Sequence, residues 1–268
     1  MSPVIRSTSR PEWSRLSQSQ CYYWRSDSGG YILSFTFKFD EMERYEFAYC
    51  YPYEYARLQT YLVNLPQDTV RQRVLSKTLQ KRNMDLLTIG NGDRTIVAMS
   101  RVHPGETPAS FIMEGFIDFI SSPHCELAIF LRSIVTFKVI PMLNPDGVAL
   151  GNYRCSLMGF DLNRHWRDTN PWAQPGLHAV KSFLVSLERE TPVDFCFDIH
   201  AHSLATGAFM YGKSFIIWAR LRPLHISYIF KVTLSMKINK MSSKPYLEYF
   251  RHMQRTFHYQ GRILTKIR

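Results

Sequence analysis

The sequence predicts an α/β protein, in which a β-sheet carries helices on both of its faces. From Asp85 onwards, short apolar runs alternate with segments whose apolar residues recur at helical spacing, an alternation typical of such sheets. A strong turn signal, Asn-Pro-Asp-Gly at 144–147, follows one of these runs. Three polar clusters fall in loops after or between the predicted strands, where ligands bind in α/β sheets.

Two strands and two helices are predicted before this region. Apolar and polar residues alternate over Tyr31–Phe39, which predicts a half-buried strand, and Phe47–Tyr51 is a second strand that ends at Pro52. Four apolar residues between 58 and 65 recur at i, i+3, i+4 and i+7, so a short amphipathic helix is predicted there. Helical spacing resumes over Val70–Gln80, which predicts another helix.

Four buried strands and two helices are predicted from Asp85 to His200. The strands cover Leu86–Ile89, Ile96–Ser100, Ile134–Leu143 and Phe195–Ile199. The helices cover Ala109–Ile120, after Pro108, and Gly176–Leu187. In the first helix, the predicted apolar face is made by Phe111, Ile112, Phe116, Phe119 and Ile120.

The composition excludes several classes of protein. With 45% hydrophobic and 21% charged residues in 268, the chain is neither disordered nor collagen-like. It has no uninterrupted apolar run of about 18 residues, so no membrane partner is expected. The first residues lack the apolar stretch of a secretory signal, and the five cysteines form no CxxC pair. We therefore expect reduced thiols in a cytoplasmic protein.

The net charge of +11 is concentrated at the end of the chain. After His200 there are twelve Lys or Arg residues and one acid, Glu248, which leaves 21 basic and 21 acidic residues before it. This step indicates a neutral domain followed by a basic segment, rather than a uniformly basic nucleic-acid binder. A solvated basic face is an equally good interpretation of the charge alone.

Three residues make a candidate zinc site. His103 and Glu106 lie three apart across a Pro-Gly turn between a strand and a helix, and His200 ends a later strand. Catalytic zinc takes three such nitrogen and oxygen ligands and keeps one position for water. An HxxE pattern is expected about 0.4 times by chance in this composition, and Glu106 could instead cap the helix. The placement of His200 is what favours a metal.

Two arginines lie in the other polar clusters. Arg154 belongs to residues 151–156 and Arg164 to residues 159–166. Near a metal, one guanidinium can hold a carboxylate through paired hydrogen bonds and another can stabilise an oxyanion. Either arginine alone is as readily explained by a surface ion pair.

Five ordered motifs, HPGE, LNPDGV, NYRCS, FDLNRHW and DIHAHS, resemble those of the zinc metallocarboxypeptidases. The resemblance is to the cytosolic carboxypeptidases, which trim glutamates from tubulin, and it runs from Tyr22 to Gly212. It implies a mixed twisted sheet preceded by remnant strands of a sandwich module. The implied divisions are a β-rich segment (1–62), the carboxypeptidase domain (63–212) and a divergent basic tail (213–268).

The resemblance also implies roles for individual residues. The implied Zn²⁺ ligands are His103, Glu106 and His200, and Asp161 would orient a zinc-bound histidine. Asn144–Gly147 would be an architectural turn.

On the substrate side, the resemblance implies that Arg154 holds the carbonyl oxygen and the oxyanion, while Asn163 and Arg164 bind the terminal α-carboxylate. The implied reaction is zinc–water attack on the terminal amide, which removes glutamates from polyglutamylated or acidic tails. The implied partners are polyglutamylated tubulin and other acidic-tailed proteins, in the cytosol or at microtubules, centrioles or cilia.

The family pattern stops after Gly212, where the basic segment begins. The segment that supplies the general base is not recognisable there, and Glu248 is a weak candidate for that base. The hypothesis is a truncated or alternatively ended chain that keeps the ligands but lacks the base and the last sheet strands, and is weakly active or inactive.

Three alternatives stay open: a non-catalytic zinc-containing binder of polyglutamate tails, a small-substrate zinc amidohydrolase, and nucleic-acid binding by the tail, although no nucleic acid is expected.

Overall fold

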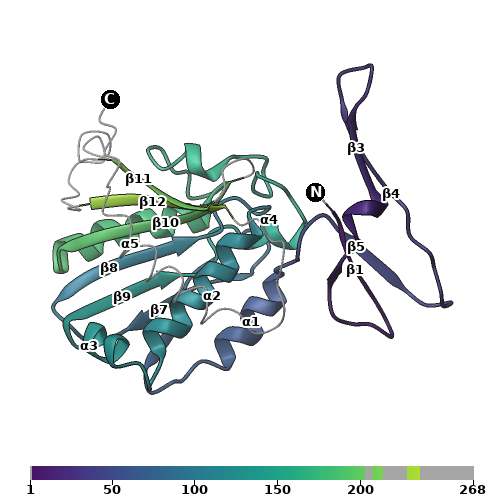
Figure 1. Cartoon of the computed structure of the whole chain (residues 1–268). Coiled ribbons are helices and arrows are strands. Elements are labelled where there is room, and N and C mark those ends of the chain that lie inside the picture. Colours follow the sequence, from purple (N-terminus) through teal and green to yellow (C-terminus); the bar gives the residue numbers. More distant parts are fainter. Residues whose placement is uncertain (1, 203–206, 214–227, 236–268) are drawn as a thin grey trace. The chain divides into compact units, whose positions relative to one another are not determined.

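The computed structural model describes residues 2–202, 207–213 and 228–235, and the chain divides into two compact units, Met1–Glu54 and Tyr55–Arg268 (Figure 1). The division predicted after residue 62 falls inside helix α1 (Tyr55–Val63), eight residues later than the division between the two units. That helix belongs to the second unit, because Arg57 forms an ion pair with Glu114 and Tyr61 bonds to Asp118 there.

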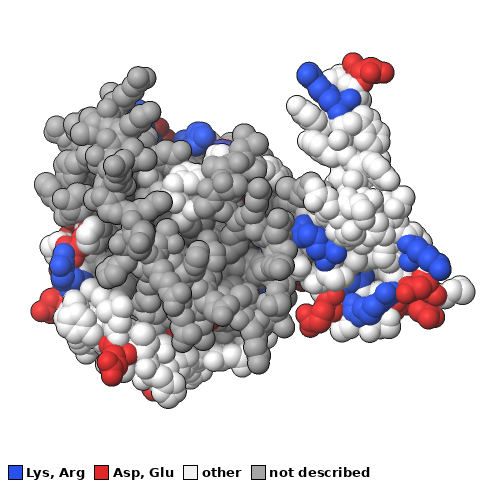
Figure 2. All heavy atoms as spheres, in the orientation of Figure 1, with Lys and Arg blue, Asp and Glu red and all other residues white. Residues whose placement is uncertain are grey.

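The first unit contains two small antiparallel sheets. One has the order β2-β1-β5 and the other is the ribbon β3-β4. The bounds are β1 Val4–Ser7, β2 Ser14–Arg15, β3 Cys21–Arg25, β4 Tyr31–Phe35 and β5 Tyr45–Ala48, with a 3₁₀ turn at Gln18–Gln20. Acidic and basic side chains lie side by side on this unit (Figure 2), and Glu46 pairs with both Arg6 and Arg44.

The predicted strand Tyr31–Phe39 is present only as far as Phe35. Beyond it, Phe37 and Phe39 leave the ribbon and pack edge-on against the rings of Tyr45 and Phe47, with centroids 5.1–6.4 Å apart. The alternation of aromatic residues therefore reflects a ring cluster as well as a strand. The second predicted strand lies two residues earlier than expected, at Tyr45–Ala48.

The second unit is built on a mixed seven-stranded sheet of order β11-β12-β10-β8-β9-β7-β6. Strands β12, β10, β8 and β9 are parallel, and the outer strands are antiparallel. The bounds are β6 Val70–Lys77, β7 Asn83–Ile89, β8 Arg94–Ser100, β9 Val135–Ile140, β10 Val193–Ala201, β11 Gly207–Lys213 and β12 Tyr228–Ser235. The four strands predicted between Asp85 and His200 are confirmed; each begins at a different residue than predicted, and two of them also end at a different one.

Helices cover both faces of this sheet, as the sequence predicts (Figure 1). Besides α1, they are α2 Thr107–Ser121, α3 Glu126–Ile134, α4 Pro145–Ala149 and α5 Pro175–Glu190, with a 3₁₀ turn at Leu162–Arg164. Within the described ranges, no helix combines the length and the apolar character needed to cross a membrane. None of the five cysteines forms a disulfide within the described part of the chain.

Alternating residues of the central strands pack into two apolar cores, one on each face of the sheet. Met84 and Leu86 of β7 and Met99 of β8 pack in one cluster with the buried face of α5. On the other face, Phe137 of β9 meets Phe116 of α2, with ring centroids 5.9 Å apart. Because central strands such as β7 and β8 are buried on both sides, their sequences are largely apolar.

The prediction of a helix over Val70–Gln80 is wrong, since Val70–Lys77 is the edge strand β6, paired with β7. Its apolar residues fit either period, and the hydrogen-bonding edge of β7 decides between them. The predicted apolar face of α2 is displaced as well. Phe116 and Phe119 are only half-buried, and the fully buried side chains are Ala109, Met113, Ile117 and Ile120.

The sequence does not predict a strand beyond Gly212, yet Tyr228–Ser235 forms β12 between β10 and β11. The hypothesis that the chain lacks the last sheet strands therefore does not hold for this segment, since Phe195–Ala201 pairs in parallel with Tyr228–Leu234. The backbone edge of β10 thus has a partner on each side.

The turn at Asn144–Gly147 anchors the chain next to the His103 loop. Asn144 caps α4 by accepting the Gly147 N–H and donates to the carbonyl of Val102. The buried carboxylate of Asp146 accepts from Thr78 Oγ1 at 2.7 Å, the Gln80 N–H at 3.1 Å and Arg82 Nη1 at 2.9 Å. Asp146 therefore ties this turn to the β6–β7 connection, as an architectural element.

We expect Asp146→Ala to lower the free energy of unfolding by about 3 kcal/mol, because it leaves a buried hydroxyl and a guanidinium without their partner. Urea unfolding followed by circular dichroism measures this change. Asp93→Ala, at an exposed aspartate between β7 and β8, is the control and leaves the midpoint unchanged. Equal midpoints for the two variants would contradict the anchoring role.

Candidate metal centre

The loop after β8 is held by a buried arginine. Arg101 is 2% exposed and adopts φ +60°, a left-handed conformation that costs about 1 kcal/mol or more for a residue other than glycine. Its Nε donates to the carbonyl of Pro104 at 2.8 Å, and its Nη1 donates to Ser110 Oγ at 2.7 Å. These bonds hold both ends of the segment that carries His103 and Glu106.

A glycine lets a second loop approach this one. The Gly105 N–H donates to the carbonyl of Tyr153 at 2.7 Å, and a Cβ at Gly105 would lie only 2.6 Å from that oxygen. Any larger residue would push the two loops apart. Arg154 follows Tyr153 directly, so this contact also places Arg154 beside the loop that carries His103.

The third candidate ligand, His200, is positioned by the pairing of β10 with β8. Strand β10 lies parallel and adjacent to β8, with Ile199 opposite Ser100. Because the carboxyl ends of both strands meet at one edge of the sheet, the end of β10 brings His200 next to the loop after β8.

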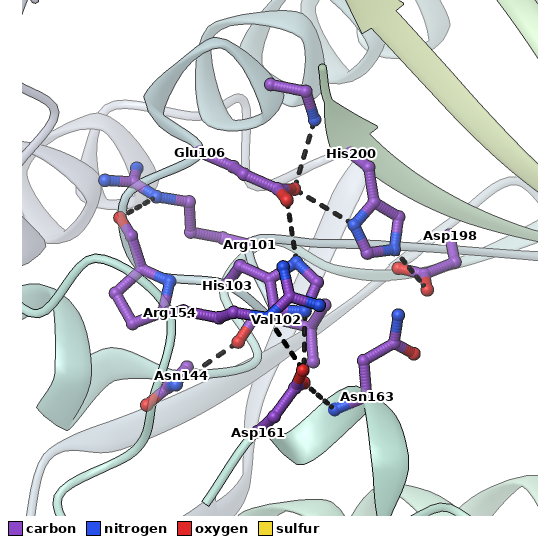
Figure 3. Close-up of polar contacts among 12 residues, drawn as sticks. Arg101, Val102, His103, Glu106, Asn144, Arg154, Asp161, Asn163, Asp198 and His200 are labelled. Atoms are coloured by element: carbon purple, nitrogen blue, oxygen red, sulfur yellow. Dashed lines mark hydrogen bonds and ion pairs between the residues drawn. The ribbon is translucent and has the colours of Figure 1, made fainter. Parts of the chain in front are cut away.

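These elements bring His103, Glu106 and His200 together (Figure 3). His103 Nδ1 lies 2.7 Å from Glu106 Oε1, and His200 Nδ1 lies 2.9 Å from Glu106 Oε2. One ligand atom from each residue lies within 4.8 Å of the other two. Glu106 immediately precedes α2 but makes no side-chain capping bond, so the capping interpretation does not hold. Its Oε2 instead also accepts the Ala201 N–H at 3.1 Å.

Each histidine has a second carboxylate behind it. His103 Nε2 lies 3.1 Å from Asp161 Oδ1, and His200 Nε2 lies 2.7 Å from Asp198 Oδ2. Both imidazoles therefore present Nδ1 toward Glu106 and Nε2 toward an aspartate. Metal-bound histidines are commonly oriented by carboxylates in this way.

The charges within this cluster stabilise one another. Burial acts to raise the pKa of Glu106, but hydrogen bonds from His103 and His200 outweigh it and lower that pKa to about 2. Burial acts to lower the pKa of His200, but hydrogen bonds to Asp198 and Glu106 raise it to about 9. For Asp161, the bond from Arg154 and the charge of His103 outweigh burial, and its pKa is lowered.

The residues present fit a zinc ion. Two imidazole nitrogens and one carboxylate form the donor set that zinc takes in catalytic sites, where three protein ligands leave one position free. The side chains of His103 and His200 are 3% and 2% exposed, and that of Glu106 is 19% exposed. An ion held here would thus be enclosed on the protein side and reachable through the Glu106 side.

The predicted substrate residues lie around Asp161. Arg154 Nε donates to Asp161 Oδ2 at 2.8 Å, and the Asn163 N–H donates to Asp161 Oδ1 at 3.0 Å. The Asn163 side chain accepts from Trp166 Nε1, and Arg164 is exposed with Nη1 donating to the Asn163 carbonyl. Arg154 is therefore linked to His103 through Asp161. Glu248 lies outside the described residues.

The sequence does not predict the roles of two residues of this region, Asp198 and Arg101. Asp198 stands two residues before His200 on the same strand, so period-two spacing, which places both on one face, was an available signal. Arg101 offered no such signal, because its buried position and its left-handed backbone arise from the tertiary fold.

Comparison with known proteins gives the class of this chain. Residues 55–212, more than half of its length, match the family described as zinc carboxypeptidase, Peptidase M14. The chain belongs to this family of metallocarboxypeptidases.

Within that family, the chain is 48% identical to human cytosolic carboxypeptidase 6 over 231 residues, which cover 80% of this chain and 46% of the human protein. It is 41% identical to cytosolic carboxypeptidase 6 of Caenorhabditis elegans, over 79% of this chain and 49% of that protein. The chain spans about half the length of these relatives.

Solved structures share the fold. The metallo-carboxypeptidase of Burkholderia cenocepacia superimposes with a TM-score of 0.71 at 22% identity, over 87% of this chain and 71% of that one. A metallo-carboxypeptidase of Pseudomonas aeruginosa gives 0.69 at 18% identity, over 91% and 74%.

The pKa values predict how the zinc-free protein responds to pH. Glu106 stabilises the fold fully above about pH 4.5, the unfolded value, and this contribution is lost as the pH falls toward 2. His200 stabilises it below about 6.5, and that contribution is lost as the pH rises through 9. We therefore expect chelator-treated protein to be most stable between about pH 4.5 and 6.5.

In Glu106→Gln, we expect the free energy of unfolding at pH 5–6 to fall by about 3 kcal/mol and to converge with that of the wild type near pH 2. Urea titrations at a series of pH values measure both curves. Glu126→Gln, at an exposed carboxylate, is the control and follows the wild type. A Glu106→Gln curve parallel to the wild type at all pH values would contradict the assigned charge state.

Proposed function

We propose that this protein is a zinc-dependent carboxypeptidase that removes glutamates from polyglutamylated or acidic C-terminal tails, above all those of tubulin. Membership of the zinc carboxypeptidase family supports the peptidase chemistry. The observation that carries the proposal is the convergence of His103, Glu106 and His200 at one edge of the sheet, with Arg154 linked to the same cluster.

The three candidate ligands would hold the metal at the edge of the sheet where β8 and β10 end. Zinc, when bound, supplies the activation of a water molecule and the polarisation of a carbonyl group. The protein contributes the orientation of its ligands, since Asp161 and Asp198 hold the imidazoles. Burial of both histidines keeps these interactions strong, because the local dielectric is lower than that of water.

Arg154 is placed to act on the substrate. Its Nε is bound to Asp161, while 42% of its side chain is exposed, so the far end of the guanidinium can reach a bound peptide. A donor fixed in this way stabilises the negative charge that develops on a carbonyl oxygen during amide hydrolysis. Asp161 thus orients both a ligand histidine and the candidate oxyanion donor.

An acidic tail suits the charges around this region. Asn163 and the exposed Arg164 border Asp161 and offer donors for a terminal carboxylate, which a guanidinium can hold through two parallel bonds. The excess of basic residues after His200 would attract polyglutamate chains from a distance. Relatives named cytosolic carboxypeptidases support action in the cytosol, and we extend this to microtubules, centrioles and cilia.

The test of the metal site is His103→Ala. We expect the wild type to hold one zinc per chain and to release glutamate only slowly from a polyglutamylated peptide, since no general base is identified, and His103→Ala to lose both properties, because a ligand is removed. Mass spectrometry of the bound metal and a glutamate assay are the measurements. His124→Ala, at an exposed histidine, is the control that keeps both.

Zinc content unchanged by His103→Ala would remove the site assignment. Zinc binding together with tight peptide binding but no glutamate release would instead identify a non-catalytic binder of polyglutamate tails, which the basic charge after His200 also favours.

We expect Arg154→Ala to lower kcat about 10²–10³-fold while the zinc content stays at one per chain, because a transition-state donor is lost and the three ligands remain. Steady-state kinetics on the polyglutamylated peptide separate kcat from KM. Arg189→Ala, at an exposed arginine in the last turn of α5, is the matched control. An unchanged kcat in Arg154→Ala would rule out the oxyanion role.

A further inference from the structure

Asp198 is a buried carboxylate whose position is explained by one neighbour. It lies on β10 two residues before His200, so both side chains project from the same face of the sheet. Its Oδ2 lies 2.7 Å from His200 Nε2, and its side chain is 12% exposed. His200 is also its one ion-pair partner among the residues that the structure describes.

The other oxygen of Asp198 is unsatisfied. Oδ1 is buried and has no hydrogen-bond partner within the described part of the chain. An unpaired buried carboxylate oxygen is energetically costly, so a residue chosen for stability alone would not be expected at this position. The bond to His200 is the interaction that compensates for this cost.

The two aspartates of the cluster differ in their surroundings. Asp161 is bound by Arg154, the Asn163 N–H and His103, so its removal would disturb several groups at once. Among the residues that the structure describes, Asp198 is bound by His200 alone. The effect of Asp198 on the site can therefore be measured separately from effects on Arg154 and the substrate.

We propose that Asp198 is a positioning residue that sets the zinc affinity of this site. By accepting a hydrogen bond from Nε2–H of His200, it orients the ring so that Nδ1 faces Glu106 with its lone pair available for the metal. Carboxylates that orient ligand histidines raise metal affinity, and their removal typically costs about 10–100-fold. This inference rests on the proposed zinc carboxypeptidase function and deepens it.

The experiment measures the zinc dissociation constant by competition with a chromophoric chelator. We expect Asp198→Ala to raise that constant about 10–100-fold. Asp198→Asn keeps an acceptor oxygen in the same place, so we expect its constant to fall between those of the wild type and Asp198→Ala. This graded rescue is not expected if Asp198 has only a structural role.

Asp194→Asn is the matched control, because Asp194 lies on the same strand and pairs with Arg94 at 2.9 Å. We expect its zinc affinity to stay within about twofold of the wild type, as it contacts no ligand histidine. Circular dichroism checks the folding of each variant. If Asp198→Ala does not fold, the zinc dissociation constants of Asp198→Asn and Asp194→Asn are compared instead, and we expect that of Asp198→Asn to be higher.

Wild-type affinity in folded Asp198→Ala, or equal affinities for Asp198→Ala and Asp198→Asn, would overturn the inference. If Asp198→Ala does not fold, equal affinities for Asp198→Asn and Asp194→Asn would overturn it. Zinc lost in His103→Ala but retained in Asp198→Ala refutes the role of Asp198 and leaves the proposed function intact. Zinc retained in both variants refutes the site itself.

Discussion

The parallel pairing of β8 with β10 is the constraint on which the metal centre depends. The two strands are neighbours in the sheet but about a hundred residues apart in the chain. Their carboxyl ends meet at one edge, so the loop that follows β8 and the last residues of β10 share a small volume. A change of one residue in the register of β10 would turn His200 to the opposite face of the sheet.

The candidate centre is a row of alternating carboxylates and imidazoles. Asp161, His103, Glu106, His200 and Asp198 form a chain in which each imidazole contacts two carboxylates. Buried carboxylates are costly when they are unpaired, and here the histidines compensate for most of that cost. The same arrangement would suit a divalent cation, since the Nδ1 atoms and the Glu106 carboxylate already point toward one another.

Backbone features outside the ligand set keep this array in place. The left-handed turn at Arg101 redirects the chain as it leaves the sheet, and the guanidinium holds the resulting loop from within. Gly105 then allows contact with Tyr153, which brings Arg154 into the same region. Asp146 anchors the neighbouring turn to the connection between β6 and β7. Rigid support of this kind is what a precise metal geometry requires.

Local patterns in the sequence predict the alternation of strands and helices, the turn at Asn144–Gly147 and the three candidate ligand residues, because apolar periodicity and local turn chemistry are properties of neighbouring residues. The tertiary structure is needed to assign Val70–Lys77 to a strand, since the edge of β7 overrides an ambiguous period. It likewise decided the placement of β12 and the pairing of Asp198 with His200. These depend on contacts between distant segments, which no local pattern encodes.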